Sequence, residues 1–239
     1  MFAMDHAATA LLLKRRYARV PLPALLLAVQ LPELLWVALN FLGIERTTTD
    51  PIVRTVSGIH LSYMPWSHSV ATMLGSAALL GALLWAATRR RDLAAGVALG
   101  IASHLVLDLA THAPDLALTP FVTGPKLGLG LYSSAPAAAF LLELAYGVFC
   151  WRVYRGSRAL LITIVLFNLA NASMFFAAVP GPEELAPRFP LLVPTLVLGQ
   201  IVITLLLTGL LARNRLDTSD GRHRALGAES SSGLGSLHP

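Results

Sequence analysis

Six long apolar segments dominate this sequence and restrict what the chain can fold into. A helix that crosses a bilayer needs about 20 apolar residues, because it rises about 1.5 Å per residue and the hydrocarbon layer is about 30 Å thick. Lipid offers the backbone no hydrogen-bond partner, so each segment must be helical. The sequence predicts an all-α, polytopic membrane protein of about six transmembrane helices at residues 21–43, 67–88, 93–111, 135–154, 158–179 and 190–212.

The charged residues support this class and predict an orientation. Charged residues make up only 13% of the chain and hydrophobic ones 55%, whereas a soluble domain carries about 25% charged residues. Fourteen of the 18 Lys and Arg residues lie before the first segment, after the sixth, or around the junctions between segments two and three and between segments four and five. Basic residues favour the cytoplasmic side, so we expect both termini in the cytoplasm. The basic excess is then a feature of topology, and no nucleic-acid partner is expected.

The two ends of the chain differ from the rest. Residues 7–13 are apolar but too few to span a membrane, and they predict a short half-inserted or interfacial helix. Residues 214–239 are rich in Ser, Gly and charge, which is typical of a disordered segment. We therefore expect a single helical membrane domain at 1–213 and a disordered cytoplasmic tail at 214–239.

A stripe of ionisable residues near the end of the third segment is the strongest candidate site. His104, Asp108 and His112 follow one another at intervals of four residues, which places them on one face of a helix. Ionisable residues are costly in a membrane and mark functional sites there. Imidazole and carboxylate together suit a divalent metal, with Zn expected and Mn or Fe as alternatives. A polar stripe that only packs against another polar helix is the competing interpretation.

Three further residues are candidate metal ligands. His68 follows Ser67, which we expect to cap the second transmembrane helix, and it lies on the same outer side as the stripe. Glu33 follows Pro32 within the first segment and is a candidate ligand or general base. His6 would reach about the depth of Glu33 and His104 if the short N-terminal helix dips into the membrane. Each could instead be a polar residue that binds no metal.

The outer loop at 112–134 offers residues that could act on a substrate. Asp115 is a candidate ligand or an acid that orients a ligand. Lys126 could hold an anionic group, and Gly128 and Gly130 would let the backbone approach it closely. A plain flexible loop explains the same composition.

Four segments together resemble a bacterial inner-membrane family known as membrane-bound metal-dependent hydrolases, some members of which are labelled permeases. The resemblance runs from about residue 6 to residue 134, and its most specific part is the His-x3-Asp-x2-Thr-His-x-Pro-Asp string. Relatives usually have Asp where this chain has Glu33, which puts the activity of this member in question. The order of the His and acidic residues is more distantly similar to zinc-dependent phospholipase C. The matching segments are Leu31-Pro32-Glu33-Leu34, Pro65-Trp66-Ser67-His68-Ser69, Ser103 to Leu116, and Gly124-Pro125-Lys126-x-Gly128-Leu-Gly130.

The resemblance implies a metal-dependent hydrolase, and the stripe offers the ligands for it. A site within the membrane favours a lipid or a lipid-linked ester or phosphoester as substrate. A metal-ion or small-solute transporter is the alternative, and a structural or assembly protein whose polar residues only join helices is the third. The metal ligands expected are His6, Glu33, His68, His104, Asp108 and His112. The sequence leaves open the oligomeric state and the number of metal ions.

Overall fold

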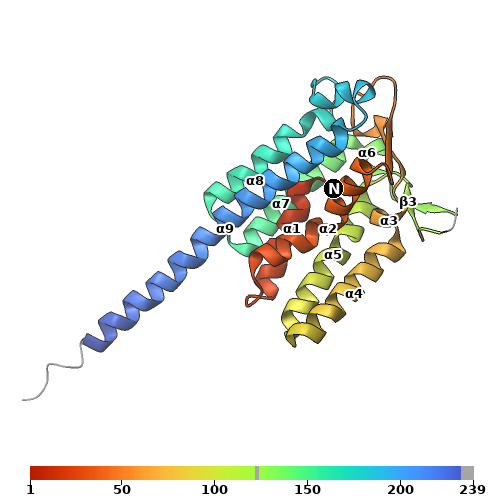
Figure 1. The fold of residues 1–239 in the computed structure, drawn as a ribbon. Helices are drawn as coiled ribbons and strands as arrows, with labels where there is room; N and C mark the ends of the chain where they lie inside the picture. Colours follow the sequence, from red (N-terminus) through yellow and green to blue (C-terminus); the bar gives the residue numbers. More distant parts are fainter. Residues whose placement is uncertain (122–123, 233–239) are drawn as a thin grey trace, which may run out of the picture.

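The computed structural model describes residues 1–121 and 124–232, and side chains as far as residue 212. Helices form most of this part of the chain (Figure 1). The α-helices are α1 (Ala3–Arg16), α2 (Leu22–Phe41), α3 (Pro65–His68), α4 (Val70–Thr88), α5 (Arg91–Thr111), α6 (Leu131–Ser134), α7 (Pro136–Tyr154), α8 (Arg158–Ala170) and α9 (Leu192–Ser232).

Five of the described helices are long and apolar enough to cross a membrane, namely α2, α4, α5, α7 and the first part of α9. This confirms an all-α polytopic membrane protein. The fifth expected span, 158–179, is wrong in length, because α8 has 13 residues and ends at Ala170. Such a helix is only about 20 Å long. The Asn171 side chain donates to the Phe167 carbonyl at this end, and short 3-10 turns follow.

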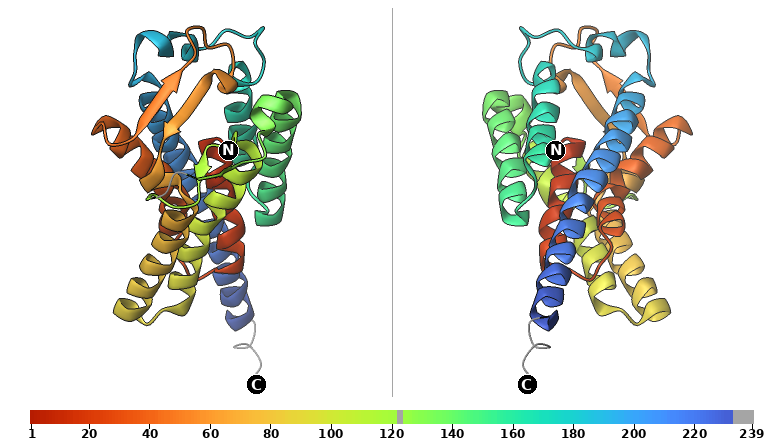
Figure 2. Two further views of the ribbon diagram at one scale, coloured as in Figure 1. Left: turned by 90° about the vertical axis from the view of Figure 1, so that its right-hand side faces the viewer. Right: turned by 90° about the vertical axis from the view of Figure 1, so that its left-hand side faces the viewer.

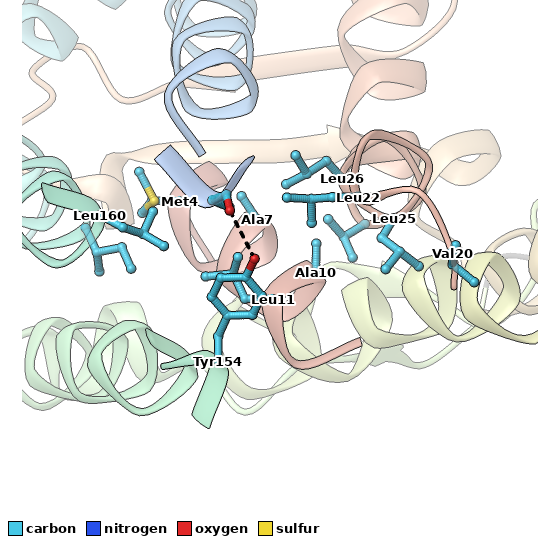
Figure 3. Packing of buried hydrophobic residues seen from close by; sticks show 13 residues of the cluster. Met4, Ala7, Ala10, Leu11, Val20, Leu22, Leu25, Leu26, Tyr154 and Leu160 are labelled. Carbon is cyan, nitrogen blue, oxygen red and sulfur yellow. Dashed lines mark hydrogen bonds between the residues drawn. The ribbon is translucent and has the colours of Figure 1, made fainter. Parts of the chain in front are cut away.

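Helix α1 lies inside the bundle, so the interfacial alternative for the N-terminal segment is wrong. It packs against α2, α5, α7, α8 and α9 (Figure 1). Ala7, Ala10 and Leu11 are completely buried. Figure 3 shows these side chains among Leu22, Leu25, Leu26 and Leu160 of the neighbouring helices. The alanines of α1 leave room for these larger side chains, so a half-length helix can fill the centre.

The two ends of the described chain lie in different surroundings (Figure 2). The Met1 ammonium group lies within the bundle, 2.8 Å from the Asp108 carboxylate. Met1 is thus at the opposite end of α1 from Lys14, Arg15 and Arg16, and the cytoplasmic location of both termini stays a prediction. Helix α9 extends from Leu192 to Ser232, and the disordered tail at 214–239 stays a prediction. Residues 233–239 of that predicted tail lie outside the described part.

Two small hairpins lie where the sequence predicts only outer loops. Strands β1 (Arg46–Thr49) and β2 (Ile59–Tyr63) pair antiparallel, with Thr48 opposite His60. Strands β3 (Leu116–Ala117) and β4 (Lys126–Leu127) also pair antiparallel. The first hairpin lies at the end of the bundle opposite the protruding end of α9 (Figure 2). The hairpins bring β2 and Lys126 to the same cavity.

Candidate metal centre

Helix α5 places the predicted stripe as the sequence indicates. His104 Nε2 lies 3.1 Å from Asp108 Oδ2, and His112 Nε2 lies 3.7 Å from Asp108 Oδ1. His104 and Asp108 are completely or almost completely buried. Helix α5 ends at Thr111, and His112 is the residue directly after it. The two carboxylate oxygens of Asp108 therefore face different histidines.

Helices α2 and α3 bring two further predicted residues to the stripe. Glu33 Oε2 lies 3.2 Å from His68 Nε2 and 3.5 Å from His104 Nε2. His68 Nε2 is also 3.7 Å from Asp108 Oδ2. Glu33, His68 and His104 present ligand atoms that all lie within 4.8 Å of one another. The structure thus brings together residues that are up to 75 positions apart in the sequence.

Helix α1 adds His6 from the opposite side. His6 Nε2 lies 3.4 Å from Asp108 Oδ1, and the His6 ring stacks on the His104 ring. His6, His104 and Asp108 form a second set of ligand atoms within 4.8 Å of one another. His6 Nε2 also lies 3.1 Å from the Met1 carbonyl oxygen, to which it can only donate. Direct binding of a metal through this nitrogen would require that hydrogen bond to break.

Backbone contact fixes the protonation of the His104 ring. His104 Nδ1 lies 2.8 Å from the Val29 carbonyl oxygen, so this nitrogen must carry a proton. The contact depends on Gly100, one turn earlier, because a Cβ there would lie 2.9 Å from the Ala28 Cβ. Helix α5 can therefore approach α2 closely. In neutral His104, Nε2 is left with a lone pair that points at Asp108 and Glu33.

The His68 ring has the same arrangement by another route. His68 Nδ1 lies 2.7 Å from the Ser67 hydroxyl, whose own proton is donated to Glu45 Oε2 at 2.6 Å. A hydroxyl has one proton, so His68 Nδ1 must donate, and in the neutral ring Nε2 keeps its lone pair. The 3.2 Å contact of Nε2 with Glu33 Oε2 is a hydrogen bond only when Nε2 also carries a proton. Ser67 was expected to cap the second transmembrane helix, but Ser69 does this by accepting from the Thr72 N–H.

These contacts leave several hydrogen-bond acceptors facing one another at the centre. Within the described residues, His104 Nε2 and Asp108 Oδ2 are buried without a hydrogen-bond partner. Bare imidazole nitrogens and carboxylates repel unless a cation lies between them, which is either a proton on each ring or a metal ion. Zinc is commonly bound by imidazole and carboxylate groups. The second nitrogen of each imidazole is then usually held by a carbonyl or a carboxylate. The residues present therefore fit a divalent cation.

His112 is oriented by Asp115, which lies beyond the end of α5. His112 Nδ1 is 3.4 Å from Asp115 Oδ1, which directs Nε2 towards Asp108. Burial disfavours the charged imidazolium, but the negative charge of Asp108 and the hydrogen bond to Asp115 outweigh it and raise the pKa of His112. The Met1 ammonium group donates to Asp108 Oδ1 and to the Thr111 hydroxyl on the same side.

A cavity of about 330 Å³ opens beside the histidines. Its polar wall holds Glu33, His112, Asp115 and Lys126. Gly128 and Gly130 do not face the cavity; a Cβ on Gly128 would lie 2.1 Å from the Ala113 carbonyl oxygen, and the Gly130 N–H donates to the His112 carbonyl. Both glycines therefore hold the loop against the end of α5. The apolar part of the cavity lining consists of Trp36, Ile59, Leu61, Val193 and Val197.

Three buried acidic residues belong to this region although none was among the predicted ligands; Glu143 was noted within an apolar segment but not assigned a role. Asp5 and Glu143 are buried between α1 and α7, and Glu45 is buried behind His68. Asp5 adjoins His6, and a charged residue inside an apolar helix could have been found by the same rule as Glu33. Glu45 lies in a loop outside every apolar segment. Acidic residues in loops are ordinarily solvated, so the sequence did not indicate that Glu45 is buried.

The comparisons with known proteins identify a family. No curated protein and no solved structure matches the chain. One family model, described as YdjM inner membrane protein, matches residues 49–179, which is more than half of the chain. The matched region contains His68, His104, Asp108 and His112. The protein therefore belongs to the YdjM inner membrane protein family.

Proposed function

We propose that this protein is a membrane-embedded, metal-dependent hydrolase that acts on an amphiphilic ester or phosphoester. The observation that carries the proposal is the meeting of bare Nε2 atoms of His68 and His104 with the carboxylates of Glu33 and Asp108. A polar stripe that only joins helices would pair donors with acceptors. With neutral imidazoles, acceptors face acceptors here, and a bound divalent cation would satisfy them, with zinc as the expected metal.

The candidate metal ligands form two groups that share Asp108. Oδ2 of this carboxylate faces His68 and His104, and Oδ1 faces His6 and His112. A carboxylate arranged in this way can serve one metal ion or bridge two. Five of the six predicted ligands belong to the two sets of ligand atoms that lie within 4.8 Å of one another, and His112 lies 3.7 Å from Asp108. Glu33 and His112 also line the cavity.

The cavity residues suggest how the chain would assist hydrolysis. A bound divalent cation lowers the pKa of a coordinated water to roughly 7 in favourable sites. Glu33 borders both the histidines and the cavity, so it is placed to accept a proton from a water molecule there. Asp115 holds His112, and Lys126 at the wall can bind an anionic group of the substrate.

The shape of the cavity supports an amphiphilic substrate. Its lining combines polar groups, among them His112 at the end of α5, with apolar side chains of α2, β2 and α9. A molecule with an anionic or ester head and an apolar chain would match both walls. Lipids and lipid-linked esters have this chemistry and are present in the surrounding membrane.

We further propose that the basic ends of the helices face the cytoplasm and that the cavity faces outward. Lys14, Arg15 and Arg16 end α1, and Arg89 to Arg91 join α4 to α5. These groups follow the usual bias of inner-membrane proteins. The hydrolysis would then take place at the outer side of the membrane.

A hydrolase fits the placement of the polar residues better than a transporter does. The residues of a transport path must continue to both sides of the membrane. Beyond His6, the buried residues of α1 are apolar except for Thr9, which is hydrogen-bonded to Tyr146. Ala7, Ala10 and Leu11 pack among Leu25 and Leu160 (Figure 3). This apolar core closes the basic end of the bundle on that face.

Bound metal and hydrolysis together test the proposal. The protein is purified in detergent, its metal content is measured, and generic ester and phosphodiester probes are supplied with and without a chelator. We expect stoichiometric metal and chelator-sensitive cleavage. Metal uptake into proteoliposomes without cleavage would establish the transporter instead, and a protein with neither property would be the structural alternative.

A further inference from the structure

Glu45 is a buried carboxylate that the proposed chemistry does not use. It lies four residues after the end of α2 at Phe41 and is 1% exposed. The N–H groups of Ile44 and Glu45 both donate to the Leu39 carbonyl, at 2.9 and 3.1 Å, which fixes the chain at this point. A carboxylate is costly to bury unless hydrogen bonds satisfy it, so its partners indicate its role.

Three hydrogen bonds direct Glu45 at the segment that carries His68. Oε1 accepts from the N–H groups of Trp66 and Ser67, at 2.8 and 2.9 Å, and Oε2 accepts from the Ser67 hydroxyl at 2.6 Å. The Ser67 oxygen accepts in turn from His68 Nδ1. The carboxylate, the hydroxyl and the imidazole therefore form one chain of hydrogen bonds whose direction is set by Glu45.

We propose that Glu45 is a positioning residue that acts through Ser67 to hold His68 as the Nδ1–H tautomer, so that His68 Nε2 points at the cation site between Glu33 and Asp108. The role as a ligand rests on the proposed function, whereas the tautomer does not. Groups that hold the second nitrogen of a metal-binding histidine fix both its tautomer and its orientation.

The positions of two acidic residues strengthen the inference. Glu33 within α2 lies 3.2 Å from His68 Nε2, and Glu45 just beyond the same helix reaches Nδ1 through one hydroxyl. The two carboxylates thus hold opposite sides of one ring. A residue that only capped α3 would need the two backbone contacts but not the contact with the hydroxyl.

Glu45→Gln is the sharpest test, because it reverses the chain of hydrogen bonds with little change of shape. The amide oxygen can keep the two backbone N–H groups, and the amide nitrogen then donates to Ser67. The hydroxyl proton turns to His68 Nδ1, and the ring becomes the Nε2–H tautomer. Nitrogen NMR of the protein with labelled histidine reads the tautomer directly, and a His68→Gln variant assigns the resonance.

The metal affinity is measured in the same variants with zinc and a competing chelator. We expect Glu45→Gln and Ser67→Ala to weaken zinc binding by about 10–100-fold, and Ser67→Thr, which keeps the hydroxyl, to stay within a few-fold of the wild type. Ser69→Ala is the matched control. It removes a buried hydroxyl two residues after Ser67 that caps α4 by accepting from the Thr72 N–H, and the hydrogen bond between Ser67 and His68 is kept.

The outcomes separate this inference from the proposed function. If Glu45→Gln or Ser67→Ala leaves His68 in the wild-type tautomer, the inference is wrong, and equal loss of affinity in Ser69→Ala would also overturn it. If the tautomer switches as expected but the wild type binds no zinc, the positioning role stands and the proposed function fails. Should Glu45→Gln not fold, the comparison of Ser67→Ala with Ser67→Thr decides.

Discussion

The imidazole rings of His6 and His104 stack face to face, with their centroids 3.8 Å apart and their planes 9° from parallel. One ring comes from α1 and the other from α5, and both are fully buried. The stack ties the short N-terminal helix to the stripe of the third predicted transmembrane segment. His6 therefore has two possible roles, one as a metal ligand and one as a packing partner of His104.

Substitution of His6 distinguishes these roles. His6→Phe keeps an aromatic ring against His104 but removes both nitrogens, so we expect a folded protein whose metal affinity falls by at least about 10-fold. His6→Ala also removes the stack and leaves a cavity, which should lower the melting temperature as well. Metal titration and thermal unfolding in detergent measure the two effects. Unchanged affinity in His6→Phe would leave His6 with packing alone.

Loss of the central pair should abolish metal binding. His104→Ala and Asp108→Asn each remove a ligand that faces two partners, so we expect less than stoichiometric zinc and no hydrolysis. His60→Ala is the control for metal content, because His60 pairs with Asp50 and supplies no ligand to the centre, although it also lines the cavity. Metal content equal to the wild type in both central variants would exclude these ligands.

Glu33 is expected to act as both a ligand and a base. Glu33→Gln keeps the size of the side chain but removes its negative charge, so hydrolysis should fall by at least about 100-fold if the group accepts a proton. Glu33→Asp keeps the charge and withdraws it from His68 and His104 by one methylene. We expect it to retain part of the activity, and rates of probe cleavage at saturating zinc measure both variants. Equal activity of Glu33→Gln and the wild type would remove the base role.

Lys126 should contribute to substrate binding and not to metal binding. Lys126→Ala is expected to raise the KM for an anionic probe with little change in kcat, because a cation at the cavity wall attracts the substrate before reaction. Arg54→Ala removes an exposed cation that does not line the cavity, and it should leave KM unchanged. A loss of bound zinc in Lys126→Ala would contradict this assignment.

Gly128 is required by the backbone of the loop and not by contact with a substrate. A Cβ at this position would meet the Ala113 carbonyl at 2.1 Å, and its φ of +144° disfavours other residues. Strain of this kind costs about 1–3 kcal/mol, so Gly128→Ala should unfold at a lower temperature. Gly124→Ala is the matched control, since nothing lies within 4 Å of a Cβ there.

The sequence predicted those parts of the fold that follow from hydropathy and helical period. Lengths of apolar sequence indicated the membrane helices, and the four-residue spacing placed His104, Asp108 and His112 on one face. Length alone failed for α8, because Asn171 and the turns after it end the helix within an apolar segment. Hydropathy also could not predict the central position of α1, since a short apolar helix suits a membrane interface and a protein core equally well.

The sequence by itself determined the class of this protein and the supply of imidazole and carboxylate groups, because these depend on composition and on repeats along one helix. Tertiary structure alone decided which atoms meet. The Val29 carbonyl at His104 and the Glu45 carboxylate behind Ser67 come from other segments. Hydrogen bonds set the tautomer of a histidine, and their partners are fixed only when helices distant in sequence pack together.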